Sequence, residues 1–162
     1  MKILVVMQAR MGSSRYANKI MMPAVGQPLL LRQAERMLAA TIPFELVVAT
    51  TTDSADGPIR ELCQSNGLAC FSGHPTDLLD RHYQAALLSK PDAVVKIPSD
   101  CPLIDPDIID KVLQFYLDNH KDYDYVSNLH PATYPDGNDV EIISFAALEK
   151  AWKVADKSFE RE

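Results

Sequence analysis

Short apolar runs alternate along this chain with segments in which apolar residues recur at helical spacing. The apolar runs are rich in β-branched residues and predict buried strands at residues 2–7, 45–50, 68–71 and 93–97. Between and after them, helices are predicted at about 29–40, 57–67, 77–89 and 105–117. Strands that alternate with helices are typical of βαβ units, so we predict an α/β fold with a mainly parallel sheet.

The later part of the chain continues this pattern with sharper helix signals. Asp105 suits the N-cap of a helix and Pro106 its first position, while Thr76 is the cap expected for the preceding helix. Two further strands are expected at 123–126 and 139–143, and a last helix from Phe145. With no repeat and no linker, residues 1–162 are predicted to form one nucleotide-binding domain. Because the chain ends without a glycine cap or turn, we expect that domain to be incomplete at its C-terminus.

The segment after the first predicted strand combines small residues with fixed positive charge. It contains Arg10, Gly12, Ser13, Ser14, Arg15 and Lys19. Backbone N–H groups of a small-residue loop, with Arg and Lys beside them, bind polyphosphates. Residues 1–36 hold six of the 16 Lys and Arg and one of the 22 Asp and Glu, a net of +5 in a chain of net charge −6. We therefore predict a nucleoside triphosphate site here; the alternative is that these are solvated loop charges.

Composition excludes several other classes of protein. The acidic balance argues against general nucleic-acid binding, which uses a basic face, and no apolar run is long enough to span a membrane. The three cysteines lack metal-ligand or disulfide spacing, so a reducing cytoplasm is the expected compartment and small buried side chains their expected role. The four histidines likewise show no ligand spacing.

Asp100 follows the strand predicted at 93–97. Ligands of open α/β sheets bind beyond the carboxyl ends of the strands, where Asp100 would face the Arg10–Lys19 loop. Magnesium is commonly held by one or two carboxylates together with substrate phosphates, so Asp100 is a candidate Mg²⁺ ligand. The alternative makes it a turn residue before Pro102. Asp105 is left out of the metal site because its capping role explains it.

Three other polar segments carry weaker signals. Residues 50–53 (Thr-Thr-Thr-Asp) either contact a nucleotide or cap the next helix, and Asp80 with Arg81 is either a ligand-binding pair or an ordinary surface pair. Asp139 and Glu141 are expected on the same side of one strand, an arrangement that turn chemistry does not require.

Four ordered motifs resemble those of a known family. Residues 8–15 followed by Lys19 resemble the signature of the sugar-acid cytidylyltransferases, which include the CMP-Kdo and CMP-acylneuraminate synthetases, and above all the branch called spore-coat polysaccharide biosynthesis protein F. The other motifs that carry the resemblance lie at 73–83, 98–105 and 134–144. The resemblance implies a three-layer αβα, Rossmann-like nucleotide-sugar transferase fold. It also implies transfer of CMP from CTP to a sugar, expected to be a sugar acid, with pyrophosphate release, in cell-surface or spore-coat polysaccharide biosynthesis.

The resemblance also implies roles for residues at matching positions. The implied nucleotide-binding set is Ala9, Arg10, Gly12, Ser13, Ser14, Arg15, Lys19, Gly73, Asp80 and Arg81. Arg15, Lys19 and Asp100 are the implied catalytic residues, with Asp100 as the ligand of Mg²⁺. Residues 16–18 (Tyr-Ala-Asn) depart from the family's Leu-Pro-Gly. Family members continue beyond this length, and the further segment is expected to supply a second metal-binding acid and part of a dimer contact.

Two other functions remain open at this point. A glycosyltransferase that consumes a nucleotide sugar would also place Mg²⁺ beside a diphosphate, and it would release a nucleoside diphosphate. A non-catalytic nucleotide-binding module would bind CTP and release no pyrophosphate. The sequence assigns neither the sugar acceptor nor the oligomeric state.

Overall fold

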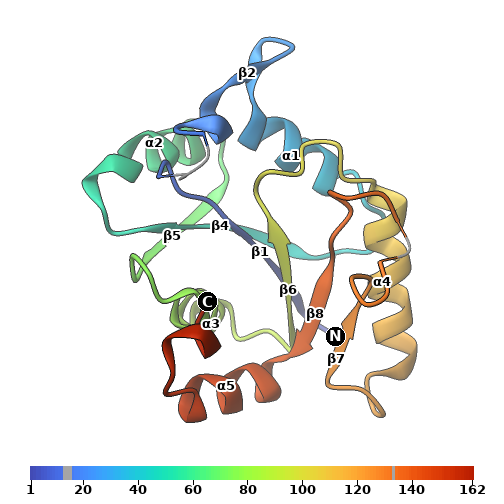
Figure 1. Cartoon of the computed structure of the whole chain (residues 1–162). Coiled ribbons are helices and arrows are strands. Elements are labelled where there is room, and N and C mark those ends of the chain that lie inside the picture. Colours follow the sequence, from blue (N-terminus) through green and yellow to red (C-terminus); the bar gives the residue numbers. More distant parts are fainter. Residues whose placement is uncertain (13–15, 133) are drawn as a thin grey trace.

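The computed structural model describes residues 1–12, 16–132 and 134–162 and has a six-stranded sheet at its centre (Figure 1). Across the sheet the strands are β5 (Ala69–Gly73), β4 (Glu45–Thr51), β1 (Ile3–Gln8), β6 (Ala93–Pro98), β8 (Glu141–Ser144) and β7 (Tyr125–Ser127). The first four are parallel, whereas β8 is antiparallel to both β6 and β7. The predicted α/β fold with a mainly parallel sheet is confirmed.

Helices cover both faces of this sheet (Figure 1). One face carries α1 (Leu29–Met37), α2 (Gly57–Ser65) and α4 (Pro106–Asn119), and the other carries α3 (Leu78–Ser89) and α5 (Phe145–Val154). Alternate residues of β1 enter the two cores: Val5 packs in the first and Val6 in the second, and both are 0% exposed. A central strand that is apolar on both faces therefore produces the three-layer αβα architecture.

The smaller elements lie outside the main sheet. They are the hairpin strands β2 (Pro23–Ala24) and β3 (Gln27–Pro28) and the short 3-10 helices η1 (Lys19–Met21), η2 (Ser54–Asp56) and η3 (Ser158–Glu160). No helix in the described part of the chain is long and apolar enough to cross a membrane.

The cap predicted for α4 is confirmed, and the cap predicted for α3 is wrong. The Asp105 carboxylate accepts a hydrogen bond from Asp107 N at 3.0 Å, as a cap of α4 should. The cap of α3 is Asp77, not Thr76, because the Asp77 carboxylate reaches Asp80 N at 2.8 Å.

Asp139 lies before the strand in which it was expected. β8 begins only at Glu141, since Val140 N donates to the Asn128 side chain at 2.9 Å instead of to a strand partner. Asp139 and Glu141 are therefore not two residues of one strand, so the strand alternation from which a common side was expected does not apply to them.

Candidate functional site

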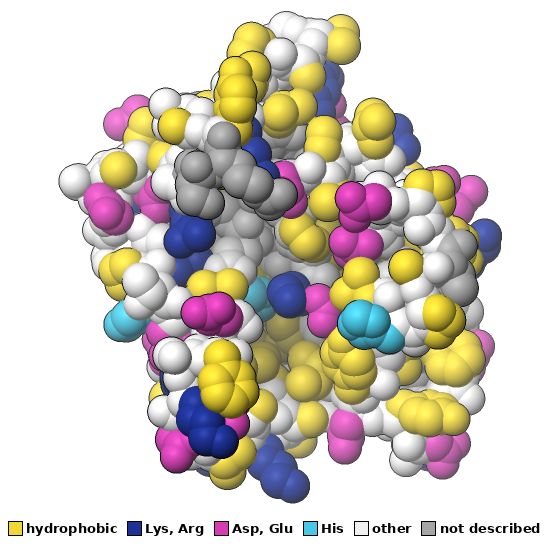
Figure 2. Space-filling model, in the orientation of Figure 1, with side chains coloured by type: hydrophobic (Ala, Val, Ile, Leu, Met, Phe, Trp, Pro, Cys, Tyr) yellow, Lys and Arg dark blue, Asp and Glu magenta, His cyan; other side chains and the backbone are white. Residues whose placement is uncertain are grey.

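The loops after β1 and β6 lie next to each other at the carboxyl end of the sheet. The two strands are adjacent and parallel, with Gln8 opposite Pro98 in register. A cleft of about 270 Å³ opens there; its lining includes Arg10, Gly12, Lys19 and Asp100. This face is hollowed near its centre, with basic and acidic side chains around the hollow (Figure 2). The structure thus brings the basic loop and the predicted metal ligand into one cleft.

An ion pair joins the two loops across this cleft. Lys19 Nζ lies 2.5 Å from Asp100 Oδ2, with 29% and 38% of the two side chains exposed. The hydrogen bond from Lys19 lowers the pKa of the Asp100 carboxyl, and partial burial opposes it only in part. Asp100 is consequently a carboxylate at neutral pH, as an oxygen ligand of a metal must be, and the Lys19 ammonium lies beside it.

The first residues of the basic loop are held by neighbouring backbone. Ala9 N continues the pairing of β1 by donating to Ala49 O at 3.0 Å, and Asn18 N donates to Met11 O at 3.2 Å. Ala9 is 1% exposed and its N–H is engaged by Ala49 O, so its predicted contact with the nucleotide stays a prediction. The predicted residues Ser13, Ser14 and Arg15 lie outside the described residues.

Asp56 orders this loop, and its role is not apparent from the sequence. Its carboxylate is 3% exposed and accepts hydrogen bonds from Met11 N at 2.7 Å and from the amide and hydroxyl of Thr51. Burial alone raises the pKa of this carboxyl, but these donors outweigh burial and hold the pKa below its ordinary value. Asp53 accepts from Ala55 N at 2.9 Å, so the capping interpretation of this segment is confirmed for that residue.

Gln33 orders the loop that carries Asp100, as Asp56 orders the basic loop. Its fully buried amide donates to Pro98 O and accepts from Cys101 N at 2.9 Å, on either side of Asp100. The available signal was a polar residue on the apolar face of a predicted helix. That signal was missed because the partners of Gln33 lie 65 or more positions away.

Arg81 is buried, so the interpretation of an Asp80–Arg81 surface pair is wrong. The Arg81 side chain is 0% exposed, and its guanidinium donates to His74 O at 2.6 Å and Pro75 O at 2.8 Å. Burial, and next the charge of Arg10, lower the pKa of Arg81, which places the two cations near each other.

Gly73 lies against this arginine. A Cβ at Gly73 would meet Phe71 Cε1 at 2.7 Å and Arg81 Cγ at 3.0 Å. The position therefore requires glycine for packing, whether or not a nucleotide contacts it.

Asp80 is engaged away from the cleft. Its Oδ1 accepts hydrogen bonds from Trp152 Nε1 at 2.8 Å and Gln84 Nε2 at 3.1 Å, which ties α5 to α3. The structure thus shows a role for Asp80 at the helix interface, and its nucleotide-binding role stays a prediction.

Asp139 and Glu141 take part in different contacts. Asp139 lines a hollow with Asp100 and Asp136, and burial, followed by the charges of Asp136, Glu141 and Asp100, raises its pKa. Glu141 pairs instead with Lys96 at 2.9 Å. Within the described ranges no group of three or more His, Cys, Asp or Glu side chains is arranged to hold a metal.

Comparisons with known proteins agree with this fold. A family model described as cytidylyltransferase matches residues 4–162. A solved cytidylyltransferase from Leptospira borgpetersenii is 33% identical, with a TM-score of 0.95 that covers 100% of this chain and 68% of that one.

Two relatives extend the comparison. An uncharacterized protein of Methanocaldococcus jannaschii is 38% identical over 162 residues, 100% of this chain and 65% of that protein. The spore coat polysaccharide biosynthesis protein SpsF of Bacillus subtilis is 30% identical over 130 residues, 78% of this chain and 54% of that protein. The chain thus spans between about half and two thirds of the length of these curated relatives.

Proposed function

We propose that this chain, which belongs to the cytidylyltransferase family, binds CTP between β1 and β6 and transfers its CMP group to a sugar acid. The observation that carries the proposal is the Lys19–Asp100 pair at 2.5 Å, which joins the basic loop to an ionised carboxylate. The resemblance of its motifs to the sugar-acid cytidylyltransferases supports the class of acceptor. The name of the Bacillus subtilis relative supports a role in polysaccharide synthesis.

In the proposed reaction a sugar hydroxyl oxygen forms a bond to the α-phosphorus of CTP. The bond from that phosphorus to the bridging oxygen breaks, pyrophosphate leaves with the electron pair, and the hydroxyl proton passes to solvent. Arg10 and Lys19 line the cleft, where their positive charges would hold the phosphate oxygens. Together with the predicted contact from Arg15, they would stabilise the charge that develops on the leaving pyrophosphate.

The donor set of the cleft fits magnesium. Asp100 is partly exposed and its pKa is lowered. The pKa of nearby Asp139 is raised by burial and by the charges of Asp136, Glu141 and Asp100. Oxygen ligands from one or two carboxylates suit Mg²⁺, which takes its other ligands from phosphates and water. When bound, the ion supplies charge neutralisation at the phosphate oxygens. Asp100 would hold it, and Lys19 would then be released to contact phosphate.

We place the reaction in the cytoplasm, in line with three free cysteine thiols.

Product analysis tests the proposal against the two alternatives. The chain is incubated with CTP, Mg²⁺ and a panel of sugar acids that includes Kdo, the sugar acid of the CMP-Kdo synthetases, and the products are separated by ion-exchange chromatography. Formation of pyrophosphate and a CMP-sugar in equal amounts is expected. In a parallel incubation with a CDP-sugar in place of CTP, release of CDP would instead support a glycosyltransferase. CTP binding without pyrophosphate from any acceptor would support a binding module.

A further inference from the structure

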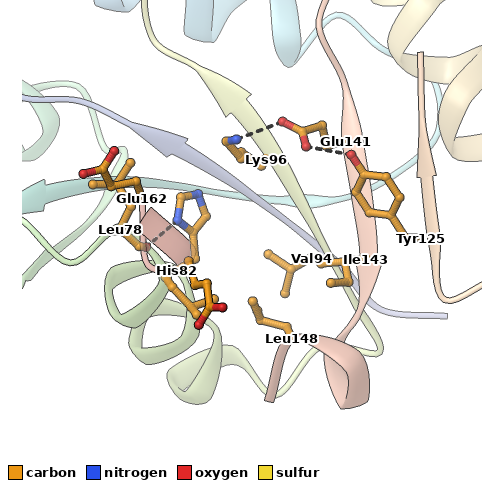
Figure 3. Close-up of a pocket in the computed structure, with 11 residues that line it drawn as sticks. Leu78, His82, Val94, Lys96, Tyr125, Glu141, Ile143, Leu148 and Glu162 are labelled. Atoms are coloured by element: carbon orange, nitrogen blue, oxygen red, sulfur yellow. Dashed lines mark hydrogen bonds and ion pairs between the residues drawn. The ribbon is translucent and has the colours of Figure 1, made fainter. Parts of the chain in front are cut away.

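We propose that a second pocket beside the nucleotide cleft binds a hydroxyl-rich acceptor, and that His82 accepts a hydrogen bond from one of its hydroxyl groups. The proposal rests on the proposed function, because it assigns the acceptor to a place. The pocket has a volume of about 160 Å³ and lies between α3, β6, β8 and α5 (Figure 3). It shares Leu78 and Lys96 with the cleft that contains Asp100. A molecule in this pocket would therefore lie next to a nucleotide in the cleft.

His82 supplies an unused hydrogen-bond acceptor in this pocket. The side chain is 7% exposed, and its Nδ1 lies 2.8 Å from Leu78 O, one turn earlier in α3. A carbonyl oxygen only accepts, so Nδ1 carries the proton and Nε2 of the neutral ring keeps its lone pair. Among the residues that the structure describes, Nε2 has no hydrogen-bond partner although it is buried. A ligand hydroxyl would satisfy it.

The surroundings of His82 favour this neutral form. Burial lowers the pKa of the imidazole most strongly, and the nearby charges of Lys96 and Arg81 lower it further. The hydrogen bond to Leu78 O and the charge of Glu141 act in the opposite direction and do not prevail. Nε2 is thus an acceptor at neutral pH, and the ligand must provide the donor.

Lys96 supplies donors on the opposite side of the pocket. Its Nζ lies 2.9 Å from Glu141 Oε1, and Tyr125 donates to the other oxygen of Glu141 at 2.8 Å (Figure 3). These three groups fix one another in position across β6, β8 and β7. Because an ammonium has three N–H groups, Lys96 retains donors for a hydroxyl or carboxylate oxygen of the ligand.

Apolar side chains and the carboxylates of Glu160 and Glu162 complete the pocket. Val94, Ile143 and Leu148 lie below the polar groups in the close-up view (Figure 3). An apolar surface with a few convergent polar groups is the usual composition of a small-molecule site. The lining of this pocket matches a sugar, which presents C–H groups on its ring and hydroxyls at its edge. The competing occupant is the cytosine base of CTP, and the experiment separates the two.

The test observes the histidine ring nitrogens of the uniformly ¹⁵N-labelled 162-residue chain by NMR, first with Mg²⁺ and CTP and then with Kdo added as the probe. We expect the free chain to show His82 as the neutral Nδ1–H form. We expect CTP to leave the His82 Nε2 resonance unchanged and the probe to shift it. A shift caused by CTP alone would assign the pocket to the base and overturn the proposal. An unchanged resonance with saturating CTP and probe would overturn it as well.

Two variants provide a second readout. His82→Phe removes the acceptor atom, whereas His82→Gln keeps an oxygen that can accept at a similar reach. At saturating CTP we expect the Phe variant to raise the KM for the acceptor about 3–10-fold, the effect of one hydrogen bond. The Gln variant should restore most of the loss, and kcat should change less than KM.

His120→Phe is the matched control, since His120 is exposed at the end of α4 and is bonded to Leu117 O in the same manner. Equal KM values in all four proteins would overturn the role of His82. The proposed function fails separately: if CTP does not bind the wild-type chain, the nucleotide site itself is wrong. If CTP binds and His82 does not respond to the probe, only the acceptor assignment is wrong.

Discussion

The Lys19–Asp100 ion pair keeps an ionised carboxylate and an ammonium together in the cleft, where they could bind a metal ion and a phosphate. The ammonium keeps the carboxylate ionised, and the carboxylate keeps the ammonium within the cleft. An exposed pair of this kind contributes little to stability, so its loss should be visible in function more than in folding.

The substitution Asp100→Asn tests whether the pair matters for function more than for folding. It retains the shape of the side chain and removes its charge, so we expect magnesium-dependent turnover to fall by about 10²–10³-fold. The midpoint of thermal unfolding should stay close to that of the wild type. The matched control is Asp122→Asn, at an exposed position after α4. Unchanged activity in the Asp100 variant would remove that residue from the site.

For Asp56, in contrast to Asp100, we expect substitution to affect the free energy of unfolding strongly and in a way that depends on pH. Its folded-state pKa is lowered, so its stabilisation is complete above the unfolded value of about 4 and is lost as pH falls through the folded pKa. We expect Asp56→Asn to reduce the free energy of unfolding by about 1–3 kcal/mol at pH 7. Urea unfolding at pH 7 and pH 3 should show this difference narrowing at pH 3. A difference that is constant with pH would contradict the hydrogen-bond account.

At the scale of elements, α1 controls the loop that carries Asp100. Gln33→Leu keeps the size of the side chain but leaves Pro98 O and Cys101 N without their buried hydrogen-bond partner. We expect a loss of about 1–3 kcal/mol in the free energy of unfolding and weaker magnesium-dependent CTP binding. Gln64→Leu, at an exposed position of α2, is the control. Wild-type nucleotide affinity in a stable Gln33 variant would show that the loop does not depend on α1.

The joint between α3 and α5 provides a test of Asp80. Because this carboxylate accepts from Trp152 and Gln84, Asp80→Ala should lower the free energy of unfolding by about 1–3 kcal/mol. Nucleotide affinity, measured well below the unfolding midpoint, should stay within about threefold of the wild type. Asp118→Ala is the matched control, since exposed Asp118 also accepts from a glutamine one turn earlier. A tenfold loss of CTP affinity confined to Asp80→Ala would support its predicted contact with the nucleotide.

Sequence patterns locate most elements because both the alternation in β1 and the helical spacing in α4 reflect burial directly. They fail where a distant side chain replaces a backbone partner. Asn128 ends the pairing of β8 at Glu141, and no local pattern near Asp139 reveals it. Arg81 is similar: its partners are the carbonyls of a loop folded over it, so a charged residue occupies a buried position.

At the scale of the whole molecule, the resemblance of the sequence motifs to the cytidylyltransferases is confirmed by the family match over residues 4–162. The site follows from topology: adjacent parallel strands bring residues 81 positions apart, Lys19 and Asp100, into contact. The concentration of positive charge in residues 1–36 of an acidic chain was the signal that pointed to it. The sequence did not reveal that Gln33 and Asp56 hold the two loops of the cleft, because their hydrogen-bond partners are set only by the fold.

The measurement that tests the central claim is a calorimetric titration of the chain with CTP, UTP, GTP and ATP, with and without Mg²⁺, repeated with Asp100→Asn. We predict that CTP binds most tightly, that Mg²⁺ strengthens its binding, and that the Asp100 variant loses the magnesium effect while keeping its fold. Binding that ignores Mg²⁺, or that Asp100→Asn leaves unchanged, would contradict the assignment of the cleft between β1 and β6.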